Sequence, residues 1–296
     1  MKAALLPDRG VVKVAGEAAR RFLHGLVTAD VEALELGQAR FAALLTPQGK
    51  IIADFIVTEA AAGDGGGFFI DCPRVLAPAL VEKLVFYRLR AKVEIEDLSG
   101  KLGVLALWGG TGATGCGLLY PDPRLPALGL RCILPPELAA DAAAELGAGL
   151  VDEAAYESHR IKLGVPRGGL DFSYGDAFPH ETDMDQLGGV DFGKGCYIGQ
   201  EVVSRVEHRG MARTRIVPVA YDGFPPEAGM AVMAGDKTVG TLGSAAGGRG
   251  LAMLRLDRVE DALATGTPLA AGGIMLRLVK PDWARFAFPG DAKAAE

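Results

Sequence analysis

Apolar residues recur along the chain with two different spacings, and each spacing predicts a different kind of element. Where they return every three or four positions, as Phe22 and Leu26 do, the pattern predicts an amphipathic helix. The helices predicted in this way cover residues 17–27, 75–87, 135–146 and 152–163. Shorter apolar runs bounded by turn residues predict strands at 41–45, 51–57, 68–70 and 102–108. Helices and strands are mixed without strict alternation, which favours an α+β fold.

The pattern changes after residue 212, where short strand-like runs follow one another at turn-rich intervals. These runs cover residues 214–221, 230–233, 238–243, 251–256 and 274–278. Strands of this length without helices between them are typical of a small β-barrel. We therefore predict three parts: a domain over residues 1–210, a C-terminal β-barrel over 213–285 and a tail over 286–296.

Composition and charge exclude several classes of protein. Of the 296 residues 49% are hydrophobic and 23% are charged, which argues against general disorder. The formal net charge of -6 gives no reason to expect direct contact with nucleic acid. No run approaches the roughly 18 apolar residues of a membrane span, so no membrane partner is expected. The cysteines at 72, 116, 132 and 196 lack zinc or redox spacing, which predicts free thiols and a cytoplasmic address.

Residues 193–201, with the sequence GKGCYIGQE, are the most informative stretch for chemistry. Gly195 and Gly199 flank Cys196, and a helix can begin at Gln200. The positive end of that helix, with Lys194 and other basic residues nearby in sequence, would favour the thiolate of Cys196. The alternative interpretation is a small buried hydrophobe in a glycine-rich turn.

Other residues offer binding chemistry with an equally simple alternative. Tyr156 and Arg160 are four apart on a predicted helix, where one face would hold a ligand with an aromatic ring and a carboxylate, or only cover apolar neighbours. Lys194 and Arg205 would pair with a ligand carboxylate. Glu201 would orient Cys196, or serve only as an acid in the first helical turn.

The histidines give no support for a metal site in this chain alone. His24, His159, His180 and His208 form no His-x-x-x-His or Cys-x-x-Cys pattern, so we predict no metal-binding residues. One thiolate can still contribute to a metal centre whose other ligands a partner supplies. Cys196 is the candidate for that contribution.

The octapeptide KGCYIGQE at residues 194–201 resembles the signature of the YgfZ family, folate-binding iron-sulfur proteins related to the glycine cleavage T-protein. Its residues are Lys194, Gly195, Cys196, Tyr197, Ile198, Gly199, Gln200 and Glu201. Four further blocks are similar to that family in the expected order, at residues 22–31, 44–51, 159–166 and 178–181. The resemblance extends over about residues 10–280.

The resemblance implies a T-protein-like folate-binding domain followed by the small β-barrel. It also implies tetrahydrofolate as a cofactor, with Tyr156 and Arg160 at its pterin ring and glutamate tail and Lys194 and Arg205 at its carboxylate. The implied function is the assembly or repair of 4Fe–4S proteins, with Cys196 as the reactive thiolate and as a ligand of a transient iron-sulfur cluster that a partner shares, because such clusters need about four protein ligands in total. Iron-sulfur assembly proteins or 4Fe–4S client enzymes would be the partners. In bacterial members this work supports tRNA modification, while the chain is most similar to the mitochondrial-type factors.

Two departures from T-protein leave other functions open. Pro78 stands about where T-protein has its catalytic carboxylate, and Lys162 where it has an acidic residue near the pterin. Whether the chain is an enzyme is therefore not decided by its sequence. The alternatives are a folate-dependent one-carbon transferase, acting by aminomethyl transfer or demethylation, and a non-catalytic folate-binding module.

Overall fold

The computed structural model describes residues 1–210 and 212–291, and the chain divides into two compact units. The first contains residues 1–156 and 187–201, and the second residues 157–186 and those from 202 onward. Our predicted boundary at 210–213 lies within the second of these units. Residues 157–186 join the second unit because Arg160 and Asp171 hydrogen-bond to Ser244 of the barrel. No described helix is long and apolar enough to cross a membrane.

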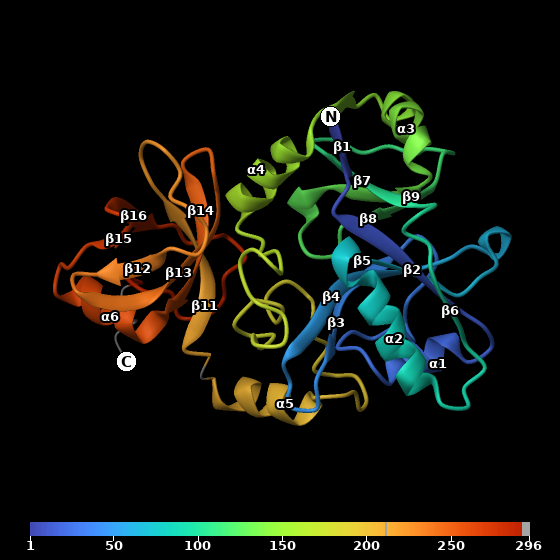
Figure 1. The fold of residues 1–296 in the computed structure, drawn as a ribbon, viewed down its shortest axis with the longest axis horizontal. Coiled ribbons are helices and arrows are strands. Elements are labelled where there is room, and N and C mark those ends of the chain that lie inside the picture. Colours follow the sequence, from blue (N-terminus) through green and yellow to red (C-terminus); the bar gives the residue numbers. More distant parts are fainter. Residues whose placement is uncertain (211, 292–296) are drawn as a thin grey trace. The chain divides into compact units, whose positions relative to one another are not determined.

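One sheet of the first unit has the strand order β3-β4-β5-β2-β6 (Figure 1). Its strands are β2 Arg9–Ala15, β3 Ala39–Leu45, β4 Ile51–Glu59, β5 Phe68–Pro73 and β6 Glu94–Asp97. Two helices, α1 Ala19–His24 and α2 Ala77–Arg88, contribute to the same apolar core. Leu23, Phe55 and Leu84 are among its fully buried side chains, as the helical and alternating patterns predict.

The other sheet of this unit has the order β10-β1-β7-β9-β8 and its own core. Its strands are β1 Lys2–Leu6, β7 Gly103–Trp108, β8 Leu118–Pro121, β9 Leu130–Leu134 and β10 Gly149–Leu150. Helix α3, Ala139–Glu145, packs its alanines against this core. Short 3₁₀ turns lie at Ala62–Asp64, Arg74–Leu76, Pro126–Leu128 and Pro136–Leu138.

The second unit contains a closed six-stranded barrel with the order β11-β14-β13-β12-β15-β16 (Figure 1). Its strands are β11 Thr214–Ala220, β12 Ala231–Ala234, β13 Lys237–Ala246, β14 Arg249–Arg255, β15 Leu269–Ala271 and β16 Ile274–Leu278. Helix α6, Leu256–Ala264, buries Val259 in the barrel core. Phe286 and Phe288, in the predicted tail, also pack against that core, while residues 292–296 lie outside the described residues.

The observed elements confirm the α+β fold with a C-terminal barrel. Two further helices, α4 Glu153–Leu163 and α5 Gln200–Arg209, begin within a residue of where the sequence predicted them. The prediction missed helix α6 and the strands β1, β2, β6, β8, β9, β10 and β15. Residues 10–12 of β2 are buried in succession, so its sequence lacks the regular polar alternation that marks a half-exposed strand.

Candidate functional site

The segment that leads into the octapeptide is fixed to β3 through Thr28. The Thr28 hydroxyl donates to the Gly189 carbonyl at 2.6 Å and accepts from the Ala43 N–H at 2.8 Å. The Asp191 N–H donates to the Thr28 carbonyl at 2.9 Å. The Asp191 carboxylate then accepts from the N–H groups of Gly193 and Lys194, at 2.8 and 3.0 Å. A closed turn therefore precedes Gly195.

Lys194 anchors the middle of the octapeptide. Its ammonium group donates to the carbonyl oxygens of His24, Val27 and Ala29, at 2.6, 2.6 and 2.9 Å. An ammonium has three N–H donors, so none remains for a folate carboxylate. Burial, opposed by Asp30 and other nearby carboxylates, lowers the Lys194 pKa to about 8. The predicted ligand contact of Lys194 is replaced by a structural one.

Tyr197 and Gly199 form the second anchor. Tyr197 is 8% exposed, lies under the Lys194 ammonium at 5.2 Å from the ring centre, and burial raises its pKa to about 12. Gly199 has a φ of +80°, and a Cβ there would lie 2.6 Å from the Thr46 carbonyl oxygen. Only glycine permits this approach to the β3–β4 turn, which Gly49 closes with an N–H to Thr46 O bond of 2.8 Å.

Between these two anchors Gly195 and Cys196 are exposed. The other thiols differ: Cys72 and Cys132 are buried, and burial raises the pKa of each to about 12. Cys116 has intermediate exposure. The structure therefore excludes the interpretation of Cys196 as a buried hydrophobe and leaves its sulfur accessible to a partner.

The rest of the motif lies in α5. The Gln200 N–H donates to the Tyr197 carbonyl at 3.3 Å, which begins the helix, and Glu201 is the acid of its first turn. Glu201 and Arg205 are both exposed. Arg205 belongs to the second unit and Cys196 to the first, so the structure does not bring them together within one unit.

Arg160 is 2% exposed and uses every N–H of its guanidinium within the second unit. Nε and Nη2 donate to the two Glu157 carboxylate oxygens, at 3.2 and 2.8 Å. Nη1 donates to Val165 O and Asp171 Oδ2, at 2.6 and 2.9 Å, and Nη2 also donates to Ser244 Oγ at 2.8 Å. A guanidinium has five N–H donors, so the predicted contact with a glutamate tail has no donor left.

Tyr156, the other predicted folate residue, is 3% exposed in the first unit. Its hydroxyl accepts from Arg124 and Arg131, at 3.3 and 3.2 Å. Arg131 also pairs with Asp71 and with Asp122, the latter at 2.9 Å. The pKa of the Asp71 carboxyl is lowered, because Arg131 and Arg9 outweigh the opposing effect of burial.

Sequence reasoning missed this buried ion network, in which directly bonded residues lie up to 62 positions apart. One signal was present: Arg131 interrupts the otherwise apolar strand β9. A charge inside such a strand must find a partner or make the fold unstable.

Three side chains of types that can bind metal ions lie together in the second unit, although we predicted no metal-binding residues. Potential ligand atoms of His180, Asp185 and Glu207 lie within 4.8 Å of one another. His180 Nε2 is 3.1 Å from Glu207 Oε2. Both Asp185 oxygens, however, accept from Arg215 at 2.9 Å. A cation bound to Asp185 would compete with that guanidinium, so the cluster is accounted for by ion pairs.

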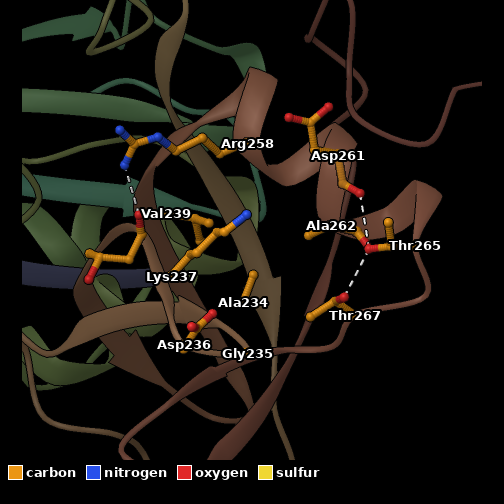
Figure 2. A pocket seen from close by; sticks show the side chains of 11 residues that line it. Ala234, Gly235, Asp236, Lys237, Val239, Arg258, Asp261, Ala262, Thr265 and Thr267 are labelled. Atoms are coloured by element: carbon orange, nitrogen blue, oxygen red, sulfur yellow. Dashed lines mark hydrogen bonds between the residues drawn. The ribbon is translucent and has the colours of Figure 1, made fainter.

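A cavity of about 720 Å³ lies on the barrel between the start of β13 and helix α6 (Figure 2). Lys237 and Arg258 line it, together with Asp236 and Asp261, so its charges balance. Arg258 is already bound to the Thr238 carbonyl at 2.9 Å. Nothing in this cavity selects a particular ligand.

Comparisons with known proteins agree with this architecture. Residues 8–114 match the family described as "GCVT N-terminal domain", and residues 213–286 match "CAF17, C-terminal beta-barrel domain". Over 97% of the chain the fold is similar to the glycine cleavage system aminomethyltransferase T from Bartonella henselae. The TM-score is 0.71, with 17% identity and 87% of that chain covered. The T-protein-like fold predicted from the resemblance is thus confirmed.

Curated relatives are similar over most of the chain. Identity is 37% to "Iron-sulfur cluster assembly factor IBA57 homolog, mitochondrial" of Mycosarcoma maydis, with 77% of this chain and 59% of that protein covered. The homologue of the same name from Pyricularia oryzae is 34% identical, with 90% of this chain and 75% of that protein covered. For "Iron-sulfur cluster assembly factor IBA57, mitochondrial" of Homo sapiens the identity is 30%, with 94% and 84% covered. The chain thus spans less than two thirds of the Mycosarcoma maydis protein.

The names of these relatives contradict the predicted cytoplasmic address, because each of the three contains the word mitochondrial. The prediction was wrong in its reasoning as well. Free thiols indicate a reducing compartment, and this property does not distinguish one such compartment from another.

Proposed function

Because the chain belongs to the IBA57 family of iron-sulfur cluster assembly factors, we propose that it supports assembly or repair of 4Fe–4S proteins through the Cys196 thiolate. The observation that carries this proposal is the contrast within the octapeptide. Lys194, Tyr197 and Gly199 are committed to the protein's own structure, while Cys196 is exposed between them. A loop fixed on both sides of an exposed thiol suits a partner-facing ligand.

The chemistry at Cys196 is ligand exchange. One iron of the transferred cluster loses its bond to a donor atom of the carrier protein and forms a bond to Cys196 Sγ. The thiol proton passes to the released donor atom or to water. No electron is gained or lost in this step. Clusters are usually held by about four protein thiolates, so one exposed cysteine requires the remaining donors from a partner, an assembly protein or a client enzyme.

Folate binding remains part of the proposal on the strength of the T-protein-like fold alone. The two residues expected to hold the pterin and its tail do not fit, because the Arg160 donors and the Tyr156 hydroxyl are already bound within the protein. No step is therefore assigned to folate. Titration of the purified protein with tetrahydrofolate is expected to show saturable binding. Absence of binding would remove folate from the proposal and leave the Cys196 claim intact.

One-carbon transfer is a weaker candidate. Pro78, where T-protein has its carboxylate, lies exposed in the first turn of α2, and no Asp or Glu occurs between residues 74 and 81. Without a carboxylate there, the position offers neither a charge nor a proton acceptor for a bound amine. A non-catalytic module with a structural cysteine is opposed by the exposure of Cys196.

Complementation of cells that lack this protein tests the proposal. Cys196→Ala is expected to fail in restoring a 4Fe–4S enzyme, and the matched variant Cys116→Ala is expected to restore it. Activity of a 4Fe–4S-dependent tRNA-modifying enzyme in the same cells tests the predicted support of tRNA modification. Equal rescue by both variants, at equal protein level, would reject the thiolate function. Thermal melting of Cys196→Ala separates loss of function from loss of structure.

A further inference from the structure

The imidazole of His24, the last residue of α1, lies beside the exposed part of the octapeptide. Its Nε2 is 3.8 Å from the position that a Cβ on Gly195 would take, and Gly195 directly precedes Cys196. No hydrogen bond to Nε2 is present among residues 1–210 and 212–291. A ring nitrogen with a lone pair therefore faces the backbone that carries the thiol.

Asp30 lies on the other side of this ring. Its Oδ1 is 3.2 Å from His24 Nδ1, a buried atom that has no hydrogen bond within residues 1–210 and 212–291, so Asp30 acts on the ring through its charge. The same oxygen accepts from the N–H groups of Glu32 and Ala33, at 2.8 and 3.3 Å. These two N–H groups fix the carboxylate, so its charge favours the tautomer with the proton on Nδ1. In that tautomer Nε2 carries the lone pair that can bind a metal.

The backbone of His24 is fixed by the octapeptide itself. Its carbonyl accepts one of the three hydrogen bonds from Lys194, at 2.6 Å. Lys194 is two residues before Cys196, so one buried cation holds both the thiol-bearing loop and the end of α1. The relative placement of Cys196 and His24 is thus built into the first unit, in which all these residues lie.

We propose that His24 Nε2 and Cys196 Sγ form a donor pair that this chain offers to one iron of the transferred cluster. The inference rests on the proposed function of Cys196. A metal-binding histidine typically has its other nitrogen held by a carboxylate or carbonyl, as Asp30 is placed to do here. Imidazole replaces thiolate on one iron of some 2Fe–2S centres, so a mixed pair has the correct chemistry. The partner then supplies the donors to the other iron.

Titration of the full chain with Co²⁺ tests the pair, because a cobalt–thiolate bond gives a charge-transfer band and the d–d bands respond to a nitrogen ligand. Loss of a supporting carboxylate typically costs 10- to 100-fold in metal affinity. We expect His24→Gln and Cys196→Ala to weaken Co²⁺ binding at least that much and Asp30→Asn about 10-fold. The matched control is His208→Gln, which removes an exposed histidine of the second unit and is expected to bind as the wild type does.

A second variant keeps the test valid if His24→Gln unfolds. Gly195→Ala leaves both donors in place and adds a methyl group in ordinary contact with Nε2, which is expected to hinder the approach of the metal. Its thermal melting is expected to match that of the wild type. Reduced Co²⁺ affinity with unchanged melting supports the pair.

The two claims fail in different ways. If His24→Gln and Gly195→Ala bind Co²⁺ like His208→Gln, with the same d–d spectrum as the wild type, His24 is not a ligand. Loss of the charge-transfer band in Cys196→Ala would then still support the thiolate. Retention of that band in Cys196→Ala would instead overturn the function proposed for Cys196.

Discussion

Each unit contains a buried cation that the sequence marked as a ligand contact, Lys194 in the first and Arg160 in the second. Both use all of their N–H donors on the protein. They differ in their acceptors. Lys194 meets neutral carbonyls, and burial lowers its pKa to about 8. Arg160 meets Asp171 and Glu157, which outweigh burial and raise its pKa.

The neighbours of the two cations differ as well. Asp171, Ser244 and Val165 around Arg160 are all buried, so this cation closes the contact between α4 and the barrel. Beside Lys194, by contrast, Gly195 and Cys196 are exposed. A buried cation in a motif therefore does not indicate a functional site by itself. An exposed nucleophilic residue beside that cation, such as Cys196 beside Lys194, does indicate one.

Removal of the Arg160 guanidinium is expected to have the largest effect. Arg160→Met leaves Asp171 buried without its cation, which typically costs about 3–5 kcal/mol in unfolding free energy. Denaturant unfolding of the full chain measures this loss. Arg277→Met is the matched control, because it breaks an exposed pair with Asp222 in the same unit. Equal unfolding curves for the two variants would show that the Arg160 network does not stabilise the second unit.

Gly199→Ala is expected to have the next largest effect. Its φ of +80° and the 2.6 Å approach to Thr46 O predict strain of about 1–3 kcal/mol. Thermal melting and amide exchange in residues 191–199 measure it. At Gly193, where a Cβ would meet only the Asp191 carboxylate at 3.4 Å, alanine is expected to cost less than about 0.5 kcal/mol. A Gly199→Ala variant as stable as Gly193→Ala would contradict the close approach to the β3–β4 turn.

The titration of Lys194 is expected to make the unfolding free energy depend on pH, which is a smaller effect with a defined sign. Its pKa is about 8 in the folded chain against an ordinary value of 10.5, so between these values the unfolded chain binds more protons. Unfolding free energy should therefore rise from pH 8 to pH 10.5, by about 1–2 kcal/mol for this group. The contribution is lost as the pH falls through 8.

Lys194→Met removes the titrating ammonium group. Subtracting the variant's curve of unfolding free energy against pH from the wild-type curve therefore isolates the contribution of Lys194. A difference that does not change across this window would show that folding leaves the pKa of Lys194 unchanged. For Arg160 we expect no change in unfolding free energy between pH 8 and pH 10.5, because its raised pKa keeps the guanidinium charged over this range. This contrast sharpens the comparison of the two cations.

Much of the architecture could be predicted, and the reason lies in local periodicity. Helix α4 and the strands β3 and β4 have apolar residues at the spacing of their element, and the turn-rich pattern after residue 212 indicated the barrel. Helix α6 was missed because the apolar run of β14 continues into Leu256. The octapeptide predicted the YgfZ family; the relatives confirm an iron-sulfur assembly-factor family, and they carry the name IBA57.

The site was predictable only in part, because its chemistry depends on contacts between distant residues. The octapeptide directed attention to Cys196, whose exposure the structure now shows. The acceptors of Lys194 lie 165 to 170 residues earlier in the chain, and no local pattern relates them to it. His24 was missed for the same reason, since it belongs to no metal-binding motif and meets the octapeptide only through the fold.

Site-resolved alkylation of the folded wild-type protein is the most direct test of the central claim, that the octapeptide exists to present Cys196. Mass spectrometry follows iodoacetamide modification of all four cysteines, with and without Co²⁺. The account predicts that Cys196 reacts first, that Cys72 and Cys132 react only on unfolding, and that Co²⁺ protects Cys196. Modification of Cys196 as slow as that of Cys72, or no protection by the metal, would contradict it.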